Sequence, residues 1–90
     1  MKKAYLFVRI FQNSDIKNVV RHIYQINSKK YIKKVEETET VESTPMIIVT
    51  IDCTEEDVLA DKIALEIIKI RRVYSVDKIL IKRNIRKPKS

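Results

Sequence analysis

The sequence has no glycine and no tryptophan, one cysteine and two prolines among its 90 residues. The phosphate-binding P-loop, the dinucleotide-binding turn and the EF-hand loop all depend on glycine, so we expect none of these sites. The single Cys53 cannot form an intramolecular disulfide, and with the single His22 it cannot complete the four-ligand shell of a structural zinc ion. We therefore expect no cofactor and no bound metal.

Long apolar segments are also missing. The longest apolar run, Ala4 to Val8, stops after five residues, whereas a helix that spans a bilayer needs about 20. The basic start of the chain leads into a stretch that contains Arg9, and no small-residue cleavage site follows it, so a signal peptide is not expected. These features predict a cytoplasmic protein without a membrane partner.

The sequence does contain a balanced mixture of apolar residues (44%) and charged residues (34%), which is typical of one small globular domain. The net charge of +7 is unevenly distributed. Residues 35–61 hold nine acidic side chains and no Lys or Arg, whereas the segments before and after them each have a net charge of +8. Either these charges form ordinary solvated surfaces, or copies of the chain meet acid to base and build larger oligomers.

Two segments show the apolar spacing of amphipathic helices. The first helix is expected to begin after an N-cap at Ser14 and to reach Ile26. The second is expected to begin where Thr54 and Asp57 resemble a capping box. Its apolar stripe is predicted to comprise Val58, Leu59, Ile63, Ile67 and Ile70, broadened by Ala60, Ala64, Leu65 and Ile68.

Four further segments, residues 3–11, 31–41, 46–53 and 73–82, have the composition of β-strands. The resulting order β-α-β-β-α-β predicts an α+β, ferredoxin-like sandwich, in which an antiparallel four-stranded sheet has two helices on one face. The first and third strands should be central and the second and fourth should be edges. We expect one domain over residues 1–82 and a basic, flexible tail over residues 83–90.

Two helices can cover only one face of this sheet, so the other face of a monomer should be polar. The central strands do not follow this rule, because they are apolar on both sides. An exposed apolar patch on neighbouring strands is typical of an interaction surface, and it predicts a homodimer or a higher oligomer. The residues expected in this interface are Tyr5, Phe7, Phe11, Met46 and Ile48.

Two segments carry a resemblance to a known family. Residues 4–10 (Ala-Tyr-Leu-Phe-Val-Arg-Ile) and residues 67–81 resemble the first strand and the helix-to-final-strand passage of the ligand-sensing C-terminal domain of Lrp/AsnC transcription regulators. The resemblance implies a regulatory domain that dimerises and senses a small-molecule effector, such as an amino acid, at an oligomer interface. The family has a Gly-containing turn before its third strand, where this sequence has Glu42-Ser43-Thr44-Pro45.

Nucleic-acid binding is the alternative function. The RNA-recognition motif has the same order of elements, and Leu6-Phe7-Val8 resembles its first-strand signature. Residues 46–53 contain no aromatic side chain, so a second base-stacking platform is missing and any binding should be electrostatic and tolerant of sequence. The candidate nucleic-acid-binding residues are Arg9, Lys82, Arg83, Arg86, Lys87 and Lys89.

An enzyme is not expected. A lone helical histidine such as His22 is more often a surface residue than a general base, and Cys53 has no evident basic partner in the sequence. Several acidic residues cluster around the predicted start of the second helix, where carboxylates stabilise the helix dipole without any metal. They are Asp52, Glu55, Glu56, Asp57 and Asp61.

Overall fold

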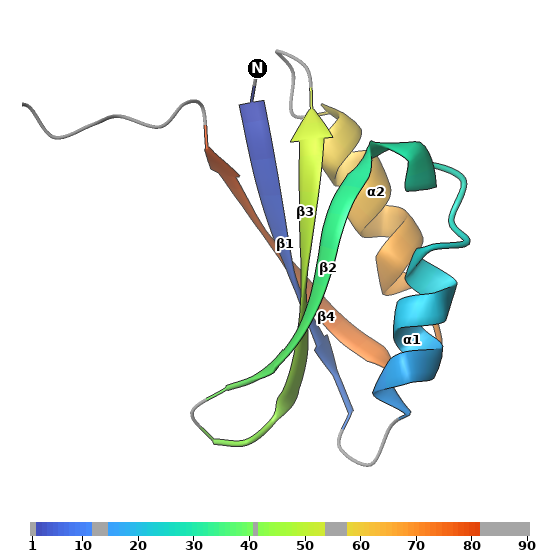
Figure 1. Ribbon diagram of the computed structural model, residues 1–90, viewed down its shortest axis with the longest axis vertical. Coiled ribbons are helices and arrows are strands. Elements are labelled where there is room, and N and C mark those ends of the chain that lie inside the picture. The colour runs from blue at the N-terminus through green and yellow to red at the C-terminus, as the bar shows by residue number, and fades with distance from the viewer. Residues whose placement is uncertain (1, 12–14, 41, 54–57, 82–90) are drawn as a thin grey trace, which may run out of the picture.

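The computed structural model describes residues 2–11, 15–40, 42–53 and 58–81 (Figure 1). The elements are β1 (Lys2–Ile10), α1 (Ile16–Ile23), a 3-10 turn η1 (Lys29–Tyr31), β2 (Ile32–Glu39), β3 (Pro45–Cys53), α2 (Val58–Ile68) and β4 (Val73–Ile81). Their order is the expected β-α-β-β-α-β, and the prediction of a ferredoxin-like α+β fold is confirmed. The predicted tail, residues 83–90, lies outside the described residues.

The four strands form one antiparallel sheet with the order β2-β3-β1-β4. The two apolar strands β1 and β3 are therefore central, and the strongly charged β2 is an edge, as the sequence predicts. Figure 1 shows α1 and α2 on the same side of the sheet. The opposite side of the sheet, which we call the open face, is covered by no described helix.

The core lies between the helices and one face of the sheet. Alternation along β1 and β3 directs one set of side chains to the helices, and each helix contributes residues spaced three or four apart. The fully buried side chains are Ala4, Leu6, Val8 and Ile10 of β1, Ile47, Val49 and Ile51 of β3, Ile23 of α1, and Ala60, Ile63 and Ile67 of α2. Each buried large aliphatic side chain contributes about 1.5–3 kcal/mol through removal from water.

Helix α1 begins one residue later and ends earlier than the sequence predicts. Its N-cap is Asp15, whose carboxylate accepts the N–H of Asn18 at 3.3 Å, so the assignment of this role to Ser14 was wrong. Aspartate and serine are comparable caps, and their adjacency hides the choice in the sequence. The helix ends at Ile23, and Ile26 packs on the core from the following turn.

The chain after α1 is attached to α2 by a carboxylate. Glu66 accepts the backbone N–H of Asn27 at 2.9 Å and the hydroxyl of Ser28 at 2.7 Å. Ser28 is only 4% exposed, so its hydroxyl needs this partner. These two hydrogen bonds fix the loop between α1 and β2 against the second helix.

Helix α2 buries a narrower stripe than expected. Leu65 is 61% exposed and Ile68 is 37% exposed, so neither broadens the core. Leu65 comes two residues after the buried Ile63 and therefore lies on the far side of the helix. The predicted capping box at Thr54 and Asp57 lies outside the described residues. Within the ranges that are described, neither helix is long and apolar enough to cross a membrane.

Candidate functional site: the open face of the sheet

The open face is populated by residues that alternate with the core residues along each strand. The strand register places Tyr5 directly between Thr50 of β3 and Ile79 of β4, and Phe7 between Ile48 and Asp77. In the next row Arg9 lies between Met46 and Ser75. On the edge strand β2, Lys34 faces Thr50, Glu36 faces Ile48 and Thr38 faces Met46.

Five apolar residues are contiguous in this register, and we call them the open-face patch: Tyr5, Phe7, Met46, Ile48 and Ile79. Directly opposed side chains in an antiparallel pair are close neighbours, and so are residues two apart on one strand. Four members are partly exposed, and Ile79 is 49% exposed. The corresponding positions on the helix side of β1 are completely buried. The patch is thus an apolar surface in contact with water.

Charged residues surround the patch. The Lys33 ammonium lies 3.2 Å from the Asp52 carboxylate, and Lys34 lies 3.5 Å from Glu36. At the other edge of the patch, Asp77 of β4 lies directly opposite Phe7 in the strand register. An apolar centre with a charged and polar rim is the arrangement found in protein–protein interfaces.

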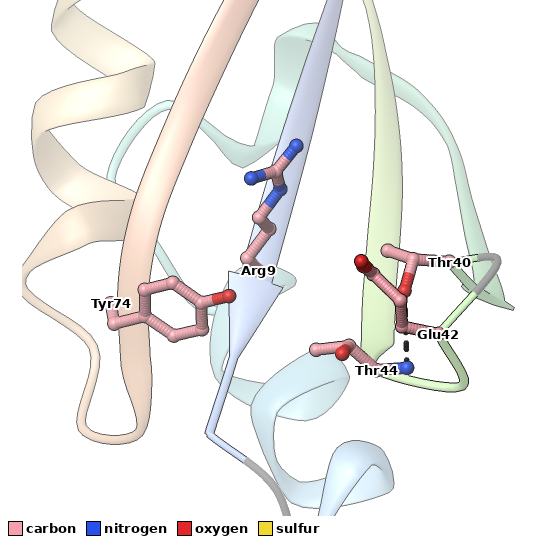
Figure 2. Close-up of a pocket in the computed structure, with 5 residues that line it drawn as sticks. All are labelled: Arg9, Thr40, Glu42, Thr44 and Tyr74. Carbon is pink, nitrogen blue, oxygen red and sulfur yellow. Dashed lines mark hydrogen bonds between the residues drawn. The ribbon is translucent and has the colours of Figure 1, made fainter.

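A pocket of about 340 Å³ lies at one end of this face, where β1 ends. Figure 2 shows its lining: Arg9 of β1, Tyr74 of β4, and Thr40, Glu42 and Thr44 of the hairpin between β2 and β3. We call it the Arg9 pocket. The backbone N–H of Thr44 donates to the Thr40 hydroxyl at 3.1 Å, and this bond holds the hairpin side of the pocket. The pocket offers a cation, an anion and two kinds of hydroxyl group.

Phe11 occupies a different place from the one expected. The strand ends at Ile10, one residue before Phe11, and the pairing of β1 with β4 shifts register between Arg9 and Ile10. Phe11 follows the strand, is 53% exposed, and places its ring 5.1 Å from that of Tyr74. Phe11 therefore borders the open face beside the Arg9 pocket and is not one of its strand residues.

Ile79 and Tyr74 are residues of this surface that the sequence prediction missed. Strand β4 reads Val-Tyr-Ser-Val-Asp-Lys-Ile-Leu-Ile, and its apolar residues do not alternate cleanly. The irregularity between Arg9 and Ile10 further shifts which β4 residues share a face. The signal available in the sequence was the pair Ile79 and Ile81, which share a face in any regular strand.

The alternative nucleic-acid residues are only partly described. Arg9 is exposed on the open face beside Met46. Lys82, Arg83, Arg86, Lys87 and Lys89 lie outside the described residues. The structure therefore brings one member of that set onto the same surface as Tyr5 and Phe7.

The residues weighed for catalysis or metal binding are dispersed. His22 is exposed on α1 and its Nδ1 lies 2.8 Å from the carbonyl oxygen of Asn18. Asp52 pairs with Lys33, and Asp61 pairs with Lys78. Among the described residues, no three His, Cys, Asp or Glu side chains gather into a group that could hold a metal ion. Glu55, Glu56 and Asp57 lie outside the described ranges.

Comparison with known proteins adds no assignment: no family model matches this chain, and a search of curated proteins finds no significant match. The proposed function therefore rests on the fold and on the open face of the sheet.

Proposed function

We propose that this chain is a small regulatory or scaffolding domain that pairs with a second copy of itself through the open face of its sheet. The observation that carries the proposal is the contiguous open-face patch, which is apolar and partly exposed. The residues that alternate with it along β1 and β3, on the helix side of the sheet, are fully buried. Covering such a patch removes apolar surface from water, which is the main favourable term in protein association.

A second copy is the partner that fits this surface best. Two identical open faces can stack as a β-sandwich, whose inner faces lie about 10 Å apart and interlock their side chains. A twofold axis uses the same patch on both copies, so the apolar centre of one meets the apolar centre of the other. The rim carries Lys33 and Lys34 beside the acids Asp52 and Glu36 with which they pair, and Asp77 on the other edge, so both signs of charge border the contact.

The resemblance to the Lrp/AsnC sensing domain implies a small-molecule effector at such an interface, and the Arg9 pocket lies at the end of the open face. A guanidinium binds a carboxylate through two parallel hydrogen bonds, and a carboxylate binds an ammonium group. Arg9 and Glu42 supply these two groups, which suits an amino acid as the effector. An effector bound there would contact both copies of the dimer.

Sequence-specific RNA binding is less well supported by the same surface. Base-stacking platforms need exposed rings on neighbouring strands. Tyr5 and Phe7 share strand β1, and the residues opposite them on β3 are Thr50 and Ile48, which have no ring. Nucleic-acid binding that depends on Phe7 would therefore contradict the proposal.

The test is a substitution that charges the patch without unfolding the monomer. Phe7→Lys is suitable because residue 7 directly faces Asp77, so the new ammonium gains a partner in the monomer. Leu65→Asp is the matched control, since Leu65 is 61% exposed on α2 and lies away from the open face. Light scattering coupled to gel filtration should show a dimer for the parent and the control, and a folded monomer for Phe7→Lys. A parent that is monomeric, or a Phe7→Lys variant that still dimerises, would refute the proposal.

A further inference from the structure

A second surface, which shares no lining residue with the open-face patch, has the features of an anion site. An open cleft of about 560 Å³ lies between α1 and the turn that joins α2 to β4. Asn18 and His22 line it from the helix, and Arg71 and Arg72 line it from the turn. Its size is in the range of small-molecule sites.

Within the described residues, the two arginines of this cleft have no ion-pair partner. Both Arg71 and Arg72 are exposed. One acid, Asp15, also lines the cleft, and its carboxylate accepts the N–H of Asn18 as the cap of α1. The cleft is therefore lined by two arginines and by one carboxylate that already accepts a hydrogen bond.

One polar side chain of α1, Asn18, has donors left for a ligand. The Asn18 side-chain oxygen accepts from Arg21 at 3.5 Å, so its amide N–H groups are the atoms that remain for another acceptor. His22 Nδ1 lies 2.8 Å from the Asn18 carbonyl oxygen, which can only accept, so Nδ1 carries the proton of that bond. The Nε2 of a neutral imidazole then accepts hydrogen bonds, so His22 lines the cleft without donating to an anion.

Arg72 also has an unfavourable backbone conformation. Its φ is 82°, in the left-handed region where glycine is the favoured residue. The carbonyl oxygen of Arg72 accepts the N–H of Phe11 at 3.0 Å, so a contact from another part of the chain holds this conformation. Strained residues of this kind cluster at functional sites, where the side chain is needed in one place.

From these observations we propose that the cleft binds a phosphate group, with Arg71 and Arg72 contacting its oxygens and Asn18 donating a further hydrogen bond. The planar guanidinium donates parallel hydrogen bonds that match the spacing of phosphate oxygens, which makes arginine the preferred residue for this ligand. The protein's net charge of +7 favours the approach of any anion. The assignment is independent of self-association, because the cleft shares no lining residue with the open-face patch.

The experiment titrates the full chain with inorganic phosphate and follows backbone amide resonances by NMR. Phosphate up to about 10 mM should shift the amides of Asn18, His22, Arg71 and Arg72, since this range detects millimolar affinity. Arg72→Gly should weaken phosphate binding about tenfold or more while leaving the melting temperature equal or higher, because glycine relieves the backbone strain. Arg71→Gln should weaken binding similarly. Lys62→Gln, which removes one exposed positive charge on α2 outside the cleft, should bind phosphate like the parent.

A single-stranded oligonucleotide in the same titration identifies the source of the phosphate. Displacement of inorganic phosphate from these four amides by the oligonucleotide assigns the site to a nucleic-acid backbone. Phosphate binding without such displacement assigns it to a small phosphate-bearing molecule. The proposal is overturned if phosphate shifts none of the four amides, or if Arg71→Gln and Arg72→Gly bind phosphate as well as Lys62→Gln does.

Discussion

The two faces of the sheet carry similar apolar side chains but differ in how deeply these side chains are buried. On one face of β1, Leu6 and Ile10 are completely buried under the helices. On the other, Tyr5 and Phe7 are equally apolar or nearly so, yet they remain partly exposed. Since burial is what stabilises an apolar side chain, the first set explains why the monomer folds, and the second set needs an explanation outside the monomer. Under the proposed function, one strand carries both the fold and the interface.

The largest expected effect is on the helix side. Leu6→Ala should lower the free energy of unfolding by about 2–5 kcal/mol, because it removes a completely buried side chain and leaves a cavity. Ile79→Ala, on the open face, should cost the monomer well under half of that, since Ile79 is 49% exposed. Chemical denaturation of both variants in the Phe7→Lys background measures the monomer alone. Equal losses would show that the two faces do not differ in the way described.

The next effect concerns the polar contact that attaches the loop after α1 to the helix layer. Glu66→Ala should cost about 1–3 kcal/mol, because it leaves the buried Ser28 hydroxyl and the Asn27 N–H without their acceptor. Glu66→Gln retains a side-chain oxygen that can accept and should lose less. Thermal unfolding of the two variants compares them directly, and identical melting temperatures for Ala, Gln and the parent would show that this contact does not stabilise the helix layer.

The smallest expected effect is the response of the open-face contact to salt. At about 1 M salt the screening length falls to roughly 3 Å, so contacts between charged edges weaken while apolar contacts persist. Any oligomer larger than a dimer, held by the acidic edge of β2 and the basic segments, should dissociate to dimers. Sedimentation at low and high salt measures this. A dimer that itself dissociates at high salt would show that its rim charges, and not the open-face patch, hold it together.

The sequence predicts more of the fold than of the surface, for a physical reason. The fold depends on periodicity, and the alternation in β1 and the apolar run of β3 are visible without a structure. The Arg9 pocket includes Tyr74 of β4, whose position beside Arg9 depends on how β4 pairs with β1. That pairing shifts register between Arg9 and Ile10, and a shift of this kind cannot be seen in the sequence. The alternation in the sequence continues to Phe11 and so predicts this residue on the open face, whereas strand β1 ends one residue earlier, at Ile10.

The cleft lined by Arg71 and Arg72 was not predictable either. Its lining residues fall within positions 15–22 and 70–72, which the fold brings together by placing α1 beside the turn before β4. In the sequence, Arg71 and Arg72 read as favourable charges at the end of a helix. The unusual backbone of Arg72 becomes visible only in three dimensions, because nothing in its neighbours marks a left-handed residue.

The measurement that tests the central claim most directly is the mass of the unmodified chain in solution, by light scattering at tens of micromolar in about 1 M salt, where charge contacts are screened. The chain has a mass of 10.7 kDa. A twofold pair formed through the open-face patch predicts twice this mass, and Phe7→Lys should return it to the single-chain value with its secondary structure intact. A mass equal to that of one chain would contradict the account and leave the open-face patch without its proposed partner.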